Sequence, residues 1–419
     1  MRTNNELGVL SLFTGAGGLD LGLEAAGFST RLCVEKCQDA IETILFNRGE
    51  WQISQERDAL KFARDPVRAL KNAGVRRSEI VLLAGGPPCQ PFSKASYWTE
   101  YGPTRMDDPR ASTISAYLKV VEKVRPEVLL FENVGAFAFT NRNEGLIALE
   151  RGIEKINRKH RTKYVTQLLQ LNAADYGVPQ LRERIFVLAH RSGKCLTLPK
   201  PTHGPRSESG EKYLSAWDAI GSLNDSPFAE DLCLKGRWAE LIPSIPEGQN
   251  YLWHTPRNSG NGAKPLFGWR TRFWSFLLKL SKEQPSWTIS ANPGPATGPF
   301  HWSNRQLSLE ELCLLQTFPR GYEIKGPSRS ARRQIGNAVP AALSELLGLE
   351  IRRQLLGHRV RTAPKLLPRR RDDCPPKESI RSVPRKYWSL CASHLDHPGT
   401  GLGPSALRRK PKQVHVNQG

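Results

Sequence analysis

The sequence has 419 residues and no long hydrophobic run, since no stretch approaches eighteen uninterrupted apolar residues. A membrane-spanning helix needs about twenty such residues, so we predict no segment that crosses a membrane. The first residues are polar before they become apolar, and they lack the apolar core and small-residue cleavage site of a secretory signal. We therefore expect a cytoplasmic protein.

Paired cysteines are also missing. The eight cysteines are spread along the chain, and none forms a CxxC pair. Cys33 and Cys37 are four residues apart, but no second pair of ligands follows them. This spacing is a weak zinc signal, and we predict no bound metal. Without a secretory signal, reduced thiols fit the pattern better than disulfides do.

Negative charge is scarce relative to positive charge. The chain has 61 Lys and Arg residues against 40 Asp and Glu residues, which gives a formal net charge of +21. A positive field of this size raises the affinity for nucleic acid. Residues 352–419 hold 16 basic and 4 acidic residues and contribute +12 of this charge. Because the segment is also rich in proline and glycine, we predict that residues 358–419 form a basic, flexible tail.

Short apolar runs alternate with amphipathic stripes over residues 1–190. The runs that predict buried strands are VLSLF (9–13), TRLCVE (30–35), EIVLLAGGPP (79–88), EVLLFEN (127–133) and RIFVLAH (184–190). The predicted helices between them cover residues 19–28, 36–47 and 113–126. This alternation indicates an α/β fold with a doubly wound, mostly parallel, Rossmann-like sheet. Ligands bind at the carboxyl ends of such strands, so the loops there are candidate sites.

The alternation stops near residue 191. Residues 191–304 are rich in Pro, Gly, Ser and Trp and carry few helical stripes, which predicts a second, smaller, irregular domain. Amphipathic helices return over residues 305–357, in LSLEELCLLQTF and AVPAALSELLGLEIRRQLL. We predict that these helices return to the domain formed by residues 1–190.

The turn FTGAGG follows the first predicted strand. Gly15 and Gly17 allow a ligand to approach the backbone closely. The NAD fingerprint needs a glycine where Asp20 stands, so the turn fits a nucleotide-like ligand without a pyrophosphate. Glu35 is placed to accept ribose hydroxyls, and Asp58 to accept from an exocyclic amine. The alternatives are an ordinary turn and two solvated acids.

Three further segments carry candidate chemistry. Cys89, in GGPPCQPFS, is either a nucleophile with a lowered thiol pKa or a buried structural cysteine. Glu132 ends an apolar strand, where a carboxyl can stay protonated and donate a proton; a turn or helix cap is the alternative. Gln180, Arg182 and Arg184 alternate in QLRERIFVLA and so share one side of a strand, unless that side is only a solvated face.

Together, these segments resemble the DNA cytosine-5 methyltransferase family of the bacterial restriction-modification type. The resemblance covers residues 7–190 and 303–352, with six motifs in the family's order: LSLFTGAGGLDLGLEAAGF, GGPPCQPFS, FENV, YGVPQLRERIFVLA, RQLSLEELCLLQTFP and QIGNAVP. It implies the fold of S-adenosylmethionine-dependent methyltransferases, with S-adenosylmethionine as methyl donor. It also implies that residues 191–304 are a target-recognition domain.

The resemblance assigns roles to individual residues. Cys89 would attack C6 of a flipped-out cytosine, whose C5 then receives the methyl group. Glu132 would contact N3 and the exocyclic amine, Arg184 would hold Glu132 and the base, and Arg182 would assist. Gln90, next to the nucleophile, would steady the flipped base. The positions that match the family's cofactor residues are Phe13, Gly15, Gly17, Glu35, Asp58 and Asn337.

The expected partner is double-stranded DNA, bound by a monomer in the bacterial cytoplasm or nucleoid, with a cognate restriction endonuclease possible. Two alternatives keep the fold: a tRNA cytosine-5 methyltransferase and a non-catalytic DNA-binding module. The size of the irregular domain argues against the first, and the presence of Cys89, Glu132 and Arg184 argues against the second. An NAD oxidoreductase is disfavoured by Asp20.

Overall fold

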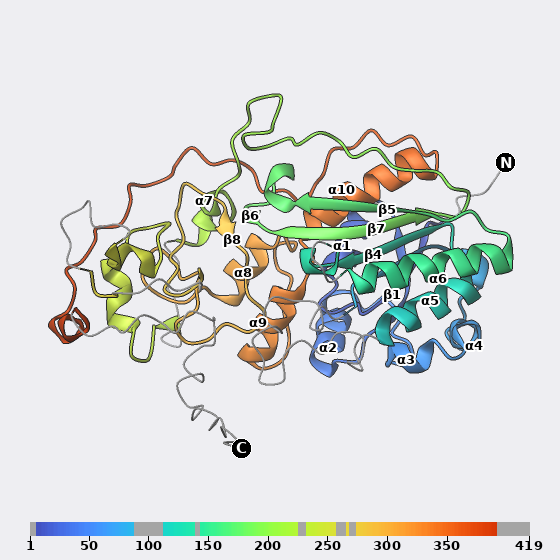
Figure 1. Ribbon diagram of the computed structural model, residues 1–419, viewed down its shortest axis with the longest axis horizontal. Coiled ribbons are helices and arrows are strands. Elements are labelled where there is room, and N and C mark those ends of the chain that lie inside the picture. The colour runs from blue at the N-terminus through green and yellow to red at the C-terminus, as the bar shows by residue number, and fades with distance from the viewer. Residues whose placement is uncertain are drawn as a thin grey trace, which may run out of the picture.

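The computed structural model describes residues 6–87, 112–138, 143–224, 232–256, 265–267 and 274–391. Two of the predicted catalytic residues, Cys89 and Gln90, lie outside these ranges. A sheet-and-helix domain lies beside a lobe with little regular structure (Figure 1).

The main sheet has six strands in the order β2-β1-β3-β4-β7-β5. These strands are β1 (Gly8–Leu12), β2 (Ser29–Val34), β3 (Ile80–Gly85), β4 (Val128–Asn133), β5 (Val165–Asn172) and β7 (Glu183–His190). Only β7 runs antiparallel to its neighbours, β4 and β5, while the pairs among β1, β2, β3 and β4 are parallel. β1 and β4 are buried along their whole length, as expected for apolar strands covered on both faces. The predicted mostly parallel sheet is confirmed.

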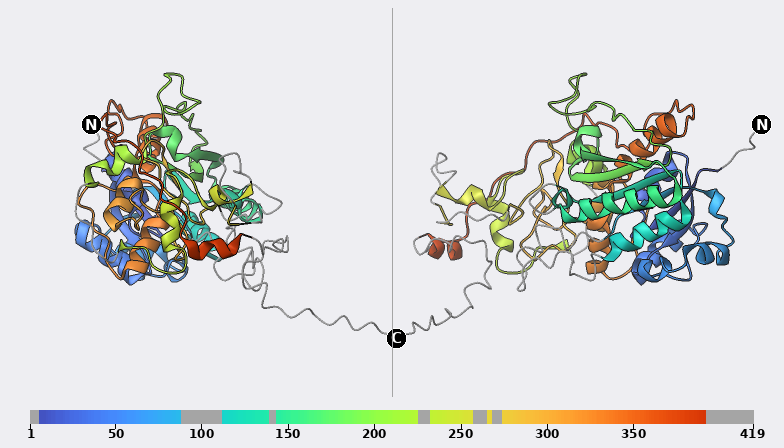
Figure 2. Two further views of the ribbon diagram at one scale, coloured as in Figure 1. Left: turned by 90° about the vertical axis from the view of Figure 1, so that its left-hand side faces the viewer. Right: turned by 45° about the vertical axis from the view of Figure 1, so that its right-hand side comes forward.

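Helices cover both faces of this sheet. The helices described outside the second lobe are α1 (Gly18–Ala25), α2 (Gln38–Asn47), α3 (Ala59–Phe62), α4 (Pro66–Asn72), α5 (Ser112–Val124), α6 (Glu144–His160), α8 (Leu309–Leu315), α9 (Ser328–Asn337) and α10 (Ala341–Glu350). Alternate side chains of the strands pack against α3 to α6 on one side and against α1 with α10 on the other. Figure 2 shows helices on both sides of the sheet. Among the described residues, none of these helices combines the length and apolar character needed to cross a bilayer.

The second lobe consists mainly of loops. Its regular elements are α7 (Ala216–Ile220) and β8 (Ser286–Trp287), together with short 3-10 turns. β8 pairs in parallel with β6 (Gln180–Leu181), the short strand just before β7, so the lobe joins the main domain next to the predicted catalytic arginines. The lobe has its own apolar core, which includes Leu241, Ile245, Tyr251 and Leu277. The domain boundaries given by the sequence remain predictions.

Residues 358–391, here called the C-terminal strap, run from η11 (Ile351–Leu355) along the second lobe (Figure 1). The backbone N–H groups of Lys365 and Leu366 donate to the buried Glu345 carboxylate of α10, at 2.7 and 2.9 Å. Tyr387 is 3% exposed and stacks on Trp238, with ring centroids 5.9 Å apart. Composition does not reveal this anchoring of the strap by backbone groups and one aromatic ring, and the flexibility of residues 358–419 stays a prediction.

A buried ion pair fixes the middle of the strap. The Lys282 Nζ donates to the Glu247 carboxylate, to the Pro376 carbonyl and to the Glu378 carboxylate, each at 2.9 Å. The Lys282 and Glu247 side chains are almost fully buried, so each charge depends on its partner. The strap therefore completes the polar interior of the second lobe as well as its apolar core.

We predict that a chain ending at residue 357 is markedly less stable than one ending at residue 391. The shorter chain loses both donors to the buried Glu345 carboxylate, at a cost of about 3 kcal/mol or more. Urea unfolding midpoints and limited proteolysis of the second lobe would measure the difference. The chain ending at 391 should match the full-length protein, and equal midpoints for all three chains would contradict the prediction.

Candidate active site

The glycine-rich turn after β1 opens the carboxyl edge of the sheet. Phe13 has φ +58°, which residues with side chains rarely adopt, and its N–H donates to the Val34 carbonyl at 2.9 Å. Gly15 and Gly17 also have positive φ, 58° and 81°, which costs glycine nothing. Within the described residues, no atom lies within 4 Å of the Cβ position of Gly15. A ligand can therefore approach the backbone there.

Two acids border this turn. The Glu35 carboxylate accepts the N–H of Gly15 and the N–H of Cys37, both at 2.7 Å. Asp58 caps α3 and pairs with the Lys36 Nζ at 2.8 Å; the hydrogen bond from Lys36 lowers the pKa of the Asp58 carboxyl. The structure thus gathers five predicted cofactor residues at one edge: Phe13, Gly15, Gly17, Glu35 and Asp58.

The sixth predicted cofactor residue, Asn337, reaches the same edge from the other end of the sequence. It is the last residue of α9 and is exposed. Two residues later, the Val339 carbonyl packs so closely on the start of α1 that a Cβ on Gly18 would lie 2.5 Å from its oxygen. Asn337 therefore lies near the glycine-rich turn.

Glu132, near the end of β4, forms a buried ion pair. Its Oε1 lies 2.9 Å from the Arg184 Nε, and the two side chains are 6% and 11% exposed. The N–H is not aligned with the oxygen, and Oε1 has no hydrogen bond from the described residues. Burial raises the pKa of the Glu132 carboxyl, while the charges of Arg184 and Arg182 oppose that shift. The carboxyl can therefore hold a proton more readily than an exposed one and still has bonding capacity for a substrate.

The segment that leads toward Cys89 begins beside this carboxyl. Gly86 follows β3, and a Cβ there would lie 2.8 Å from the Glu132 Oε2. Only glycine fits such a close approach without a shift of the carboxyl. The described part of this segment ends at Pro87, two residues before Cys89. The structure therefore gives the position of Glu132 and Arg184 but not that of the predicted nucleophile.

A family model for C-5 cytosine-specific DNA methylases matches residues 7–353, which is most of the chain and includes every predicted site residue. The chain belongs to the C-5 cytosine-specific DNA methylase family. It is thus a DNA cytosine-5 methyltransferase, and the prediction of this enzyme class is confirmed.

Two curated relatives of this methyltransferase are bacterial. It is 35% identical to the type II methyltransferase M.SacI of Streptomyces achromogenes, over 84% of this chain and 94% of the relative. It is 29% identical to the type II methyltransferase M1.HphI of Haemophilus parahaemolyticus, over 81% and 84%.

Solved structures share the fold. A protein described as a prophage-encoded DNA modification methyltransferase of E. coli aligns with a TM-score of 0.60 at 20% identity, covering 84% of this chain and all of that chain. The Entamoeba histolytica methyltransferase EhMeth aligns with a TM-score of 0.53 at 15% identity, over 84% and 99%. The predicted methyltransferase fold is therefore confirmed.

A buried polar network that the sequence did not predict lies behind the Glu132 carboxyl. Arg182, Gln180 and Gln316 are all 0% exposed. The Gln180 Nε2 donates to the Gln316 Oε1 at 3.2 Å, and the Gln180 Oε1 accepts from the Arg182 Nη1 at 3.4 Å. Gln180 and Gln316 are separated by 136 positions in the sequence. The only sequence signal for their contact is that each lies in a motif that resembles the same family.

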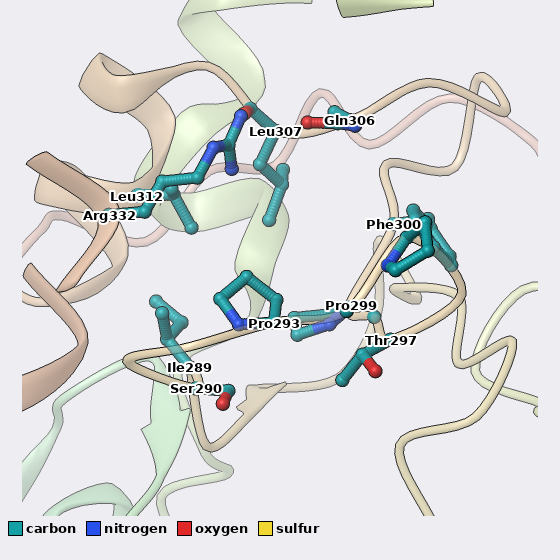
Figure 3. Close-up of a pocket in the computed structure, with 13 residues that line it drawn as sticks. Ile289, Ser290, Pro293, Thr297, Pro299, Phe300, Gln306, Leu307, Leu312 and Arg332 are labelled. Carbon is teal, nitrogen blue, oxygen red and sulfur yellow. The ribbon is translucent and has the colours of Figure 1, made fainter. Parts of the chain in front are cut away.

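A pocket opens beside this network, where the second lobe meets α8 and α9 (Figure 3). Its walls include Ile289, Pro293 and Pro299 from the lobe and Leu312 from α8. Arg332 of α9 lines the pocket and donates to the Leu307 carbonyl at 2.8 Å. None of the predicted site residues that the structure describes lines this pocket, so it is distinct from the Glu132 carboxyl and the glycine-rich turn.

Asp20, which the sequence uses to exclude an NAD site, lies beneath the glycine-rich turn. It is 0% exposed, and neither carboxylate oxygen has a hydrogen-bond partner among the described residues. The nearby Ser11 hydroxyl favours the charged form but lies outside hydrogen-bond geometry. Burial dominates and raises the pKa of Asp20 from 3.8 to about 7.

This pKa predicts a pH-dependent effect of Asp20→Asn. The pKa of Asp20 in the folded protein, about 7, exceeds the value of 3.8 that applies without burial. The free energy of unfolding of the wild-type protein therefore falls as the pH rises from 4 toward 7. Asparagine stays neutral, and the variant should gain up to a few kcal/mol relative to wild type above pH 7. Unfolding midpoints at pH 4.5 and pH 8 would measure this gain. The matched control Asp372→Asn, at an exposed site, should show none; a gain independent of pH would contradict the prediction.

Proposed function

We propose that this enzyme transfers a methyl group from S-adenosylmethionine to C5 of a cytosine flipped out of a specific duplex DNA sequence. The observation that carries this proposal is the Glu132–Arg184 ion pair, whose buried carboxyl has a raised pKa and an oxygen without a hydrogen bond from the described residues. This arrangement suits a group that binds and protonates a heteroaromatic ring.

The proposed chemistry begins with Cys89. Its thiolate forms a bond to C6 of cytosine, because C5 is a poor nucleophile until the ring carries such an adduct. The π electrons of C5 and C6 move into the ring toward N3, and the Glu132 carboxyl donates a proton or hydrogen bond there. Arg184 orients the carboxyl. C5 then takes the methyl group, with S-adenosylhomocysteine as the leaving group, and N3 gives its proton back to Glu132. C5 loses its own proton to water, the electrons of that C–H bond re-form the C5–C6 double bond, the sulfur–C6 bond breaks and the thiolate is restored.

The carboxyl edge of β1 and β2 fits S-adenosylmethionine, which supplies an activated methyl group when bound. Glu35 and Asp58 would hold its ribose and its exocyclic amine, while the backbone of Gly15 and Gly17 would lie against it. The fit is supported by the open space over Gly15 and by the absence of a glycine where a pyrophosphate-binding turn requires one. Asn337, next to the start of α1, would close the site from the other end of the chain.

The DNA must deliver a base to a buried carboxyl. A stacked cytosine cannot reach Glu132, so the base is extruded, at a cost of a few kcal/mol, and Gln90 would steady it. Residues 191–304 would read the sequence by contacts to base edges. The two bacterial type II relatives support a role in restriction-modification. We further propose that the enzyme acts as a monomer in the bacterial cytoplasm and uses S-adenosylmethionine without a metal.

Incubating the protein with S-adenosylmethionine labelled in its methyl group, together with mixed-sequence duplex DNA and tRNA, would test this function. We expect label in DNA, recovered as 5-methylcytosine after digestion to nucleosides. Label in tRNA alone would favour an RNA methyltransferase, and label in neither would favour a non-catalytic DNA-binding module. Methylome sequencing of cells that express the protein would then identify the recognition sequence.

A further inference from the structure

The guanidinium of Arg182 points away from the surface into the seam where three parts of the chain meet. Its Nη2 donates to the Gly336 carbonyl at 2.6 Å and to the Ala338 carbonyl at 2.9 Å. Its Nη1 donates to the Ile289 carbonyl at 3.2 Å. Gly336 is in the last turn of α9 and Ala338 is the first residue after it, while Ile289 lies near the end of the second lobe, close to where β8 joins β6.

The two carbonyls held by Nη2 flank Asn337, the predicted cofactor residue. The bond to Gly336 fixes the peptide plane that precedes Asn337, and the bond to Ala338 fixes the chain one residue after it. Gln316, the residue after α8, holds the same turn, since its Nε2 donates to the Ile335 carbonyl at 2.7 Å. Two buried side chains from distant parts of the chain therefore hold the last turn of α9, where the helix carbonyls need partners from outside the helix.

Arg182 differs from Arg184 in this respect. Arg184 lies 2.9 Å from the Glu132 carboxylate, whereas the described hydrogen bonds of the Arg182 guanidinium go to backbone carbonyls and to Gln180. Arginine suits this role because its planar fork carries five donors and stays charged when buried. A lysine there would keep the charge but could not reach carbonyls in three directions with the same geometry.

We propose that Arg182 is a positioning residue. It holds the end of α9 around Asn337, and therefore the cofactor site, in a fixed position relative to Ile289 at the end of the second lobe. The inference rests on the proposed function and deepens it. The sequence places Arg182 among the catalytic residues; the geometry assigns it to the backbone that presents the cofactor site. Binding of S-adenosylmethionine, rather than the chemical step, is then the quantity that Arg182 controls.

The test compares Arg182→Lys with Arg184→Lys in the full-length protein. The dissociation constant of labelled S-adenosylmethionine is measured by equilibrium dialysis, and kcat and KM by methyl transfer to DNA. Arg182→Lys should raise the dissociation constant and KM for the cofactor about tenfold, the effect of losing one or two bonds to a charged group, with kcat at saturating cofactor within about threefold. Arg184→Lys should show the reverse, a lower kcat with an unchanged dissociation constant.

Gln316→Met gives an independent measure, because it releases the same turn without touching the charge near Glu132. It should weaken cofactor binding as Arg182→Lys does, and it replaces that variant if Arg182→Lys does not fold. Arg182→Met should also move the pH profile of kcat to higher pH, since the Arg182 charge lowers the pKa of Glu132; Arg182→Lys should not.

The proposal is overturned if Arg182→Lys or Gln316→Met binds the cofactor like wild type, or if Arg182→Lys loses kcat at saturating cofactor while its dissociation constant is unchanged. The dialysis measurement does not require turnover. A wild-type protein that binds S-adenosylmethionine but methylates no nucleic acid would therefore refute the proposed function and leave the positioning role to be judged by binding alone.

Discussion

The Cys89→Ala variant should transfer no detectable methyl group to DNA, a loss of more than about 10⁴-fold, while it binds DNA like wild type. The physical reason is that no other group can supply the electrons that make C5 nucleophilic. Methyl transfer is measured with labelled S-adenosylmethionine, and DNA binding by titration of a labelled duplex at fixed salt, because phosphate contacts make affinity salt-dependent.

An exposed cysteine serves as the matched control. Cys195 is a free, exposed thiol, and Cys195→Ala should keep wild-type activity. DNA containing 5-fluorocytosine should form a covalent complex with wild type and with the Cys195 variant, because a fluorine at C5 blocks the step that releases the enzyme. A covalent complex that persists in Cys89→Ala would show that another residue is the nucleophile.

Replacing Glu132 by glutamine should lower kcat by about 10²- to 10³-fold. The glutamine amide can still hydrogen-bond to the base, but it cannot give N3 a proton. Burial raises the pKa of the wild-type carboxyl, so its protonated fraction falls as the pH rises through that raised value. The alkaline decline in kcat that this produces in wild type should be absent from the variant. Rates at saturating substrates across pH 6 to 9 would show both effects.

Glu183 provides the comparison for this variant, because it lies one residue from Arg184 and its side chain is exposed. Glu183→Gln should stay within about twofold of wild type in rate and keep its pH profile, as surface substitutions usually do. A Glu132→Gln variant with near-normal kcat would remove the carboxyl from the chemical mechanism and would leave it a structural partner of Arg184.

The main sheet could be predicted because its central strands have continuous apolar sequences. β1 and β4 are buried throughout, and their polar ends, at the glycine-rich turn and at Glu132, mark the site. β5 was not predicted, since it is an edge strand with largely half-exposed residues. α9 was also missed, because its sequence SRSARRQIGN offers few apolar residues at helical spacing.

The network around Arg182 could not be predicted for a different reason. Its acceptors are mostly backbone carbonyls, at Ile289, Gly336 and Ala338, and every residue has a carbonyl. The sequence indicates that Arg182 and Arg184 lie on the same side of a strand. Only the structure shows that Arg184 pairs with the Glu132 carboxylate, whereas Arg182 binds the carbonyls at the end of α9. The contacts of the strap could not be predicted for the same reason, since its anchors include N–H groups at Lys365 and Leu366.

The packing of α1 against α10 has a consequence for biosynthesis. The two helices share one core cluster although more than 300 residues separate them. At about 5–20 residues per second, the ribosome makes α10 on the order of tens of seconds after α1, and Tyr387, which completes the core of the second lobe, later still. Apolar surface on α1 therefore stays uncovered during translation, which makes the nascent chain a candidate client for chaperones. A cell that depends on this enzyme to modify its DNA must also allow for that delay after each round of synthesis.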